Sequence, residues 1–409
     1  MINKQETYKR KIIKHLYFSG TLSCAELSTL TNKSVPLTTR VLSELIEDGY
    51  VVETGLALST GGRRPLTYAL KTDLMYIVSV AMDQLITRIA ILDMHNNYVG
   101  EITNADISLY NNPGALELLI STIDKHISQS GIAKENIIGI GIGMPGFVDV
   151  VKGINHSFLK TDNGQSIVNI AETAIGIPVI IDNDSSLIAL AELKLGGARN
   201  KKNSMVVNIG WGIGLGIIVK EELFRGYNGF AGEFSHISIF SNNKLCGCGK
   251  NGCLETETSL LVVAQKAIQG LQNGKSSVLK LSDLSLDHAE ETSKAIIDAA
   301  IKGDRFAVEL LSESAYNIGR GIAILIHLLN PELIILSGRG ATAGKLLLTP
   351  IQQAINEHCI PKISENTEIK ISSLTHQAEL IGAAALVMDS FEKNLNGKMI
   401  NGKNEVDSM

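Results

Sequence analysis

The feature that most constrains the fold is a change in hydrophobic pattern near Met75. Beyond it, short apolar runs typical of strands alternate with longer runs of helical spacing, which predicts an α/β protein with mixed sheets. The strand-like runs cover 76–80, 87–92, 137–143, 178–181, 205–209, 214–219 and 333–336. The helical runs cover 114–129, 185–195, 256–270, 290–302 and 304–329. The residues before the change follow a different pattern, which indicates a separate module.

That first module, residues 1–72, has the order of a winged helix-turn-helix. The expected elements are a basic helix ending near Ser19-Gly20, helices over 24–31 and 34–48, and two strands within 50–70. Ser23 and Glu26 have the spacing of a capping box for the second helix. The alternative is a three-helix module that binds another protein.

In a winged helix-turn-helix the third helix enters the major groove of DNA with its N-terminal residues at the base edges. The candidate DNA-contacting residues of this helix are Ser34, Leu37, Thr38 and Arg40. Arg63 and Arg64 lie in a Gly-Gly-Arg-Arg-Pro tip, and arginines of this kind are attracted to narrow A·T-rich minor grooves. A solvated basic hairpin is the alternative for the tip.

Charge and composition fit a nucleic-acid module on a soluble body. Residues 1–71 carry a net charge of +4 and the remainder −9, an asymmetry typical of a DNA-binding head. The 409 residues allow two or three domains, and 44% hydrophobic residues exclude a disordered chain. No apolar run approaches the ~18 residues of a membrane span, and the N-terminus lacks a secretory core. We therefore expect a cytoplasmic protein without membrane insertion.

Three of the five cysteines cluster at Cys246, Cys248 and Cys253. With His236 they form a Cys₃His set, enough for a closed tetrahedral zinc site. Four protein ligands leave no open position, so the zinc is predicted to be structural, tying the His236 segment to the cysteine loop. The alternative is free thiols without metal.

Five motifs then occur in one order, at 139–149, 182–184, 232–236, 246–255 and 330–338. They begin with Gly-Ile-Gly-Ile-Gly-Met-Pro-Gly-Phe-Val-Asp, Asp-Asn-Asp and Gly-Glu-Phe-Ser-His, continue with the cysteine loop, and end with Asn-Pro-Glu-Leu-Ile-Ile-Leu-Ser-Gly. Together they resemble the ROK family of repressors, open reading frames and kinases, over about 75–390. With the preceding helix-turn-helix, the chain resembles the repressor branch, which includes glucose, N-acetylglucosamine and xylose regulators.

The resemblance implies an actin-like, hexokinase-like (ribonuclease H-like) body of two lobes with a sugar cleft. The first lobe is expected at 73–195, completed by a helix at about 377–392, and the second at 196–376; the polar tail 393–409 is expected to be disordered. The resemblance also assigns sugar contacts to Asn183, Asp184, Glu233, His236 and Glu255. Asp184 matches the general base of the kinases, and its alternative role is a helix N-cap.

Kinase activity is not expected, because both phosphate loops depart from the family's pattern. Kinases carry Asp-x-Gly-Gly-Thr in the first hairpin, where this chain has Ala-Met-Asp-Gln-Leu at 81–85. In the second loop, Gly-Trp-Gly-Ile-Gly at 210–214, Trp211 replaces a hydroxyl residue, and Ser337 replaces a glycine further on. Without these glycines the backbone cannot come close to a phosphate, and Asp83 adds negative charge, so both changes oppose phosphate binding. Asp184 is then expected to be a vestigial base.

The sequence thus predicts a sugar-responsive transcriptional repressor with structural zinc. It would bind a double-stranded operator as a homodimer or tetramer and respond to a sugar, amino sugar or sugar phosphate. One alternative is a ROK-type sugar kinase with an added DNA-binding head. Another is a repressor sequestered by a membrane sugar transporter.

Overall fold

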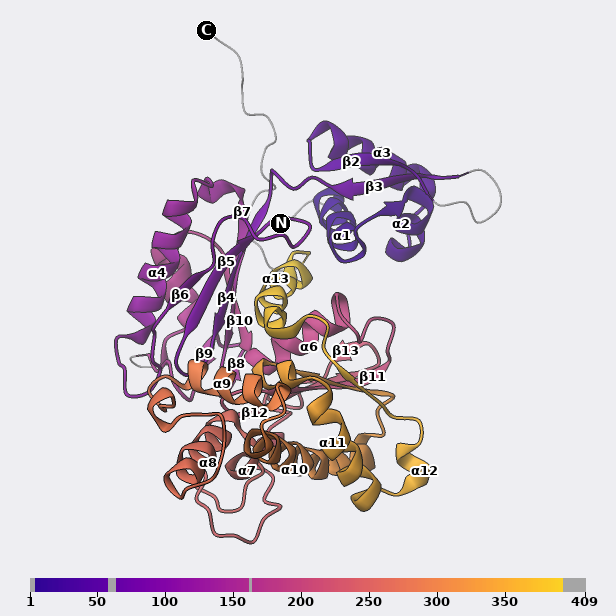
Figure 1. The fold of residues 1–409 in the computed structure, drawn as a ribbon. Coiled ribbons are helices and arrows are strands. Elements are labelled where there is room, and N and C mark those ends of the chain that lie inside the picture. Colours follow the sequence, from indigo (N-terminus) through magenta and orange to yellow (C-terminus); the bar gives the residue numbers. More distant parts are fainter. Residues whose placement is uncertain (1–3, 58–63, 162–163, 393–409) are drawn as a thin grey trace. The chain divides into compact units, whose positions relative to one another are not determined.

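The computed structural model describes residues 4–57, 64–161 and 164–392, so residues 58–63 of the wing and the C-terminal tail 393–409 lie outside the described residues (Figure 1). The chain divides into two compact units, Met1–Asp184 with Leu380–Met409, and Ser185–Glu379. Each unit contains a five-stranded sheet. In these described segments, no helix has the length and apolar character needed to cross a membrane.

The N-terminal module in the first unit is the predicted winged helix-turn-helix. Its elements are α1 (Lys4–Ser19), β1 (Leu22–Ser23), α2 (Cys24–Thr31), α3 (Val35–Glu47), β2 (Val51–Leu56) and β3 (Leu66–Leu70). The capping box is confirmed: the Ser23 hydroxyl accepts from the Glu26 amide, and the Glu26 carboxylate accepts from the Ser23 amide. Asn32 ends α2 in the left-handed conformation, which Asn tolerates. The turn and the strand order β1-β3-β2 complete the motif.

The rest of the first unit is a sheet in the order β10-β7-β4-β5-β6 with helices on both faces. Its strands are β4 (Tyr76–Met82), β5 (Thr87–Leu92), β6 (Thr103–Ala105), β7 (Ile137–Met144) and β10 (Val179–Asn183). One face packs against α4 (Ala115–Ser130) and α5 (Ile167–Ile175), and the other against α13 (Ala378–Ser390). A Cβ at Gly141 would lie 2.1 Å from the Ala383 carbonyl oxygen, so glycine lets α13 approach β7 closely.

The second unit repeats this layering with a sheet in the order β13-β12-β11-β14-β15. Its strands are β11 (Asn203–Ile209), β12 (Ile213–Val219), β13 (Glu222–Leu223), β14 (Leu333–Ser337) and β15 (Glu368–Ile371). One face carries α8 (Leu260–Gln272), α9 (Ala289–Ile301), α10 (Arg305–Leu329) and α11 (Lys345–His358). The short helix α7 (Glu255–Thr258) contacts α8 and α10. The predicted α/β fold class is confirmed.

One helix belongs elsewhere than predicted. The predicted first lobe, 73–195, includes 185–195, whereas nearly all of α6 (Asp184–Lys194) groups with the second unit. Ile188 and Ala189 pack into a buried cluster with strand residues of the second sheet. A Cβ at Gly216 would lie 2.2 Å from the Ala189 Cβ, so a glycine in β12 makes room for the helix.

Candidate functional site

The predicted metal donors converge in the second unit. The ligand atoms of His236, Cys246, Cys248 and Cys253 all lie within 4.8 Å of one another. The Cys246 Sγ is 3.5 Å from the His236 Nδ1, and the Cys248 Sγ is 3.6 Å from the Cys253 Sγ. Ligands of a tetrahedral zinc with bonds of about 2.0–2.3 Å lie roughly 3.3–3.8 Å apart. The donor set therefore fits a zinc-sized cation.

A tight hairpin over residues 244–253, called here the metal hairpin, brings the three sulfurs together. Isolated bridges pair Leu245 with Asn251 and Ser238 with Cys253. Gly252 has a φ of +74°, and a Cβ there would lie 2.0 Å from the Phe240 carbonyl oxygen. Only glycine allows both this positive φ and this close approach without strain. The turn therefore requires glycine directly before Cys253.

The thiols of this cluster differ in acidity. Burial and the neighbouring sulfurs raise the pKa of Cys253 to about 12, and burial raises the pKa of Cys246. At Cys248, hydrogen bonds that include the Lys250 amide outweigh burial and lower the pKa. A bound cation would favour the thiolate form of all three, so metal binding is expected to release protons.

Two predicted sugar-binding carboxylates lie beside the metal donors. The Glu233 Oε2 is 3.7 Å from the His236 Nε2, and the Glu255 Oε1 is 3.8 Å from the Cys246 Sγ. His236 thus directs one ring nitrogen to the sulfurs and the other to a carboxylate. Burial, with the charge of Glu255, raises the pKa of Glu233, although His236 opposes the shift.

The other predicted sugar residues belong to the first unit. Asn183 ends β10 and Asp184 begins α6, and both are half-buried. The Asn183 side-chain amide donates to the Gly146 carbonyl oxygen at 3.1 Å. Because β10 runs parallel to β7, this contact lies at the carboxyl edge of the sheet, where α/β proteins bind ligands.

The exposed side of α3 presents part of the predicted DNA surface. Ser34 and Arg40 are exposed and Leu37 is half-buried, whereas Arg64 is exposed in the wing and Arg63 lies outside the described residues. The prediction for Thr38 is wrong. Its side chain is fully buried, and its hydroxyl bonds to the Tyr8 hydroxyl at 2.7 Å and the Ser34 carbonyl oxygen.

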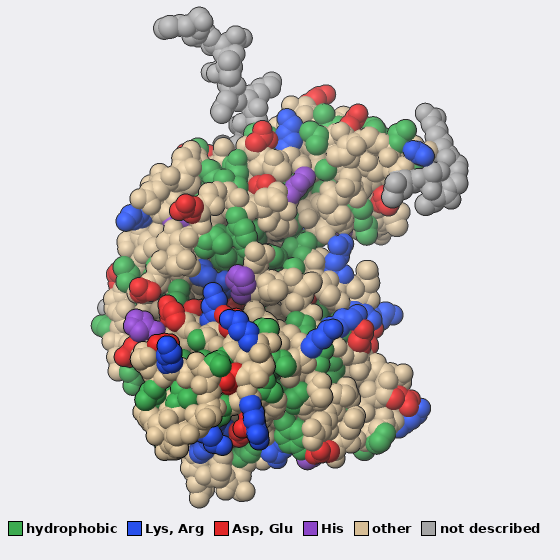
Figure 2. All heavy atoms as spheres, viewed as in Figure 1, with side chains coloured by type: hydrophobic (Ala, Val, Ile, Leu, Met, Phe, Trp, Pro, Cys, Tyr) green, Lys and Arg blue, Asp and Glu red, His purple; other side chains and the backbone are tan. Residues whose placement is uncertain are grey.

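Sequence reasoning also missed Thr39, which is exposed on α3 beside Arg40. Val41, Leu42 and Leu45 are buried, and counting the helical period back from them would have placed Thr38 inside and Thr39 outside. On the face that Figure 2 shows, Lys and Arg side chains are interspersed with Asp and Glu. The candidate DNA surface therefore consists of the exposed side of α3 and the described part of the wing.

Comparisons with known proteins agree with this architecture. The ROK family profile matches residues 110–390, and a winged helix-turn-helix DNA-binding profile matches residues 5–52. The chain is 30% identical to a xylose repressor of Caldicellulosiruptor bescii, over 93% of this chain and 95% of that protein. It is also 35% identical to a glucokinase of Halalkalibacterium halodurans, over 66% of this chain and 82% of that enzyme.

A solved structure covers nearly the whole fold. The crystal structure of a ROK family transcriptional regulator, a homologue of the E. coli MLC protein, aligns with a TM-score of 0.75 and 25% identity. The alignment spans 94% of this chain and 97% of that regulator. From its helix-turn-helix to α13, the chain belongs to the ROK family.

Proposed function

We propose that the chain is a cytoplasmic, sugar-responsive repressor that binds a double-stranded operator as a homodimer or tetramer. The observation that carries this proposal is the joining of a winged helix-turn-helix to a ROK body within one chain. The xylose repressor and the ROK regulator align over both parts, whereas the glucokinase aligns over 66% of the chain. A sugar, amino sugar or sugar phosphate is the effector.

In this proposal, the sugar hydroxyls are bound by Asn183, Asp184, Glu233, His236 and Glu255. Carboxylates accept hydrogen bonds from hydroxyls, and such charged bonds are worth about 1.5–3 kcal/mol each. The effector must bind the DNA-incompetent state more tightly, or it can shift nothing. A 100-fold loss of operator affinity corresponds to about 2.7 kcal/mol of coupling.

Zinc is the cofactor that the Cys₃His set supports. With His236, Cys246, Cys248 and Cys253 as ligands, it would supply folding free energy to the hairpin rather than catalysis. It would also hold Glu233 and Glu255 near each other for the sugar.

The DNA-binding head would be residues 1–72, with Ser34, Arg40 and Arg64 as its proposed contacts and Leu37 at their edge. Paired heads of a dimer read two half-sites spaced by whole turns of DNA. We therefore expect an inverted repeat as the operator.

Contacts between α1 and the end of α13 supply a route from body to head. The buried Arg10 side chain donates to the Phe391 carbonyl oxygen at 3.4 Å, and its guanidinium lies 5.3 Å from the Phe391 ring centre. The Lys14 ammonium is 2.9 Å from the Asp389 carboxylate. In our proposal, a shift of α13 on sugar binding moves α1 and alters the DNA-binding head.

The second candidate function is a sugar kinase, which the glucokinase relative favours. The turn between β4 and β5 argues against it. The Asp83 carboxylate accepts hydrogen bonds from the amides of Leu85 and Ile86 at 2.7 and 2.8 Å. Amides engaged by a carboxylate are unavailable to cradle a phosphate, and the negative charge opposes one.

The glycine loop between β11 and β12 argues the same way. Trp211 is only 5% exposed, and the Arg339 guanidinium lies 5.1 Å from its ring centre. The Arg339 Nε donates to the Glu290 carboxylate at 2.6 Å. A stacked and ion-paired arrangement of this kind fills space that a nucleotide would need, so we propose that the chain transfers no phosphate.

Control by a transporter protein is a further candidate. Leu245 in the metal hairpin is 74% exposed, and Phe224 and Tyr227 in the preceding loop are 50% and fully exposed. Exposed apolar side chains of this kind can bind a protein. This mode predicts that Leu245→Ser changes repression in cells while leaving the sugar response of the purified protein intact.

A thermal-shift screen of sugars, amino sugars and their phosphates, with and without Mg-ATP, tests the main proposal. Stabilisation by one sugar, unchanged by ATP, is expected from binding linkage. Stabilisation by ATP followed by ADP formation would establish the kinase instead.

A further inference from the structure

A buried carboxylate contacts the residues at the base of the metal hairpin. Glu257 lies in α7, four residues after Cys253 and two after Glu255, and only 7% of its surface is exposed. Buried charges are costly unless they are paired. The partners of Glu257 therefore indicate what it does.

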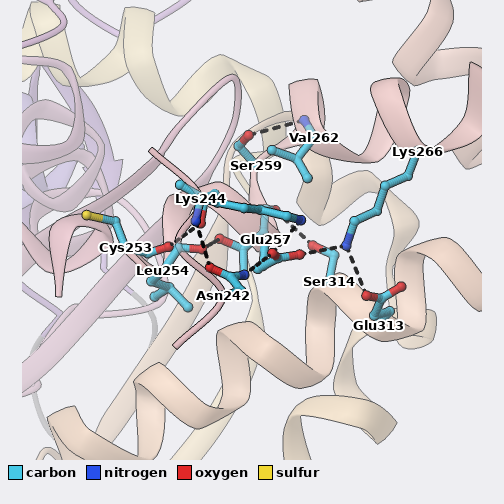
Figure 3. Close-up of polar contacts among 12 residues, drawn as sticks. Asn242, Lys244, Cys253, Leu254, Glu257, Ser259, Val262, Lys266, Glu313 and Ser314 are labelled. Carbon is cyan, nitrogen blue, oxygen red and sulfur yellow. Dashed lines mark hydrogen bonds and ion pairs between the residues drawn. The ribbon is translucent and has the colours of Figure 1, made fainter. Parts of the chain in front are cut away.

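Each oxygen of Glu257 binds a different part of the unit (Figure 3). Oε1 accepts from the Lys244 ammonium at 2.5 Å and from the Asn242 side-chain amide at 2.6 Å. Oε2 accepts from the Lys266 ammonium of α8 at 2.9 Å. One side chain thus joins the hairpin to the helix layer.

The hairpin is held at its base by these contacts. Lys244 precedes Cys246 by two residues, and its carbonyl oxygen accepts from the Gly252 amide at 3.1 Å. The Asn242 side-chain oxygen in turn accepts from the Lys244 amide at 3.2 Å. The segment that leads to the first two sulfurs is therefore fixed on both sides.

The helix that carries Glu257 is itself anchored. The Thr258 hydroxyl donates to the Leu254 carbonyl oxygen at 2.7 Å, and the Ser314 hydroxyl of α10 donates to the Thr258 carbonyl oxygen at 2.8 Å. Lys266 also binds the Glu313 carboxylate at 2.9 Å (Figure 3). Glu257 therefore links the hairpin to helices α8 and α10.

We propose that Glu257 is a positioning residue for the metal centre, holding the Lys244 segment so that Cys246 and Cys248 meet Cys253 and His236 at one point. This inference rests on the proposed metal site. Partners outside the ligand set orient the ligands, and their loss typically costs about 10–100-fold in metal affinity.

The test compares full-length wild type with Glu257→Gln by chelator competition for Zn²⁺. Glu257→Gln keeps the volume and removes the charge, so its zinc dissociation constant is expected to rise about 10–100-fold. Glu313→Gln is the matched control, because it removes the same charge from Lys266 without contacting the hairpin. Its zinc affinity should stay within about twofold.

A second variant guards against a folding defect. Lys244→Met removes the hairpin's own cation, whose side chain is 48% exposed, and leaves Glu257 paired with Lys266. We expect a smaller rise in the same dissociation constant. The absorption of the Co²⁺-substituted proteins gives a second readout: misplaced sulfurs shift the thiolate-to-cobalt bands at saturation, whereas simple destabilisation leaves the bands unchanged.

The outcomes separate the two claims. A wild-type protein that binds no zinc would overturn the metal site, and the positioning role with it. If wild type binds zinc, and both Glu257→Gln and Lys244→Met have the zinc affinity and the cobalt spectrum of wild type, the positioning role alone would be overturned.

Discussion

The metal hairpin and the glycine loop of the second unit lie in contact but differ in chemistry. A Cβ at Gly212 in the glycine loop would lie 2.6 Å from the Glu255 carboxylate. On the hairpin side, four metal donors and two carboxylates are all present. On the loop side, the Arg339 guanidinium stacks on the ring of Trp211, the residue between the first two glycines of the loop.

This difference is what the proposed role, sugar sensing without phosphoryl transfer, requires. Phosphoryl transfer depends on positioned phosphates and their charge neutralisation. In the proposed role, the Asp83 turn and the Trp211 loop would provide neither. Sugar binding needs only hydroxyl partners, which the proposed sugar residues Glu233 and Glu255 on the hairpin side would supply. Because a repressor and a glucokinase align with the same body, the fold does not decide between them, and the site residues do.

The largest expected effect is on the hairpin side. Cys253→Ser replaces a fully buried sulfur, and bound zinc should fall from one per chain to none, because a three-ligand site loses the closed tetrahedral set. Elemental analysis of the purified protein measures this. Cys24→Ser, outside the cluster, should keep its zinc, and full zinc retention in Cys253→Ser would contradict the assignment of Cys253 as a zinc ligand.

A second expectation concerns sugar affinity. Asp184→Asn should weaken binding of the effector found in the thermal screen about 10–100-fold, since a charged hydrogen bond is worth about 1.5–3 kcal/mol. Isothermal titration calorimetry gives the constant. Asp124→Asn, a surface carboxylate paired with Lys134 in the same unit, is the control. Equal affinity in both variants would leave Asp184 as a helix cap.

The DNA head should respond separately from the body. Arg40→Ala is expected to lower operator affinity about 10-fold, from roughly 1–3 kcal/mol per specific contact, while sugar affinity stays unchanged. Fluorescence anisotropy on a duplex selected from a random pool measures the operator affinity. Arg305→Ala, the control, removes the same charge from a 92% exposed side chain of the other unit. An equal loss of operator affinity in that variant would mean that Arg40 acts only through its charge and makes no specific contact.

The smallest expected effect is on the loop side. Wild type and Trp211→Thr should both show no ATP binding, because the first turn stays closed by Asp83. Adding Ala81→Asp, Asp83→Gly, Gln84→Gly and Leu85→Thr should give weak nucleotide binding with a dissociation constant of about 1 mM, or 4 kcal/mol. Calorimetry would show it. Nucleotide binding by wild type itself would mean that the loop side is intact.

Local sequence signals predicted the head well. The capping box of Ser23 and Glu26 and the two strands around the tip follow from neighbours within a few residues. The burial of Thr38 follows from the helical period of Val41, Leu42 and Leu45, and it was misassigned because that period was not applied. Its hydroxyl partner Tyr8, however, lies 30 residues away in the chain. Such a pairing is invisible to propensity and spacing.

The same contrast holds in the body. The convergence of the candidate metal donors could be predicted, because clustered cysteines with a histidine nearby in the chain are typical of metal sites. The grouping of α6 with the second unit gave no such signal, because its partners there include Ile335, which comes from a strand far along the chain. Glu257 gave no signal either, since a Glu in a short helix is ordinary until Lys244 and Lys266 are seen around it.

The central claim, a sugar sensor that controls DNA binding without phosphoryl transfer, is tested most directly in one titration. Labelled operator duplex bound to the full-length protein is titrated with the effector sugar in the presence of Mg-ATP, while anisotropy and ADP are followed together. We predict that the sugar releases the duplex and that no ADP forms. ADP formation in step with added sugar, or anisotropy that the sugar leaves unchanged, would contradict the account.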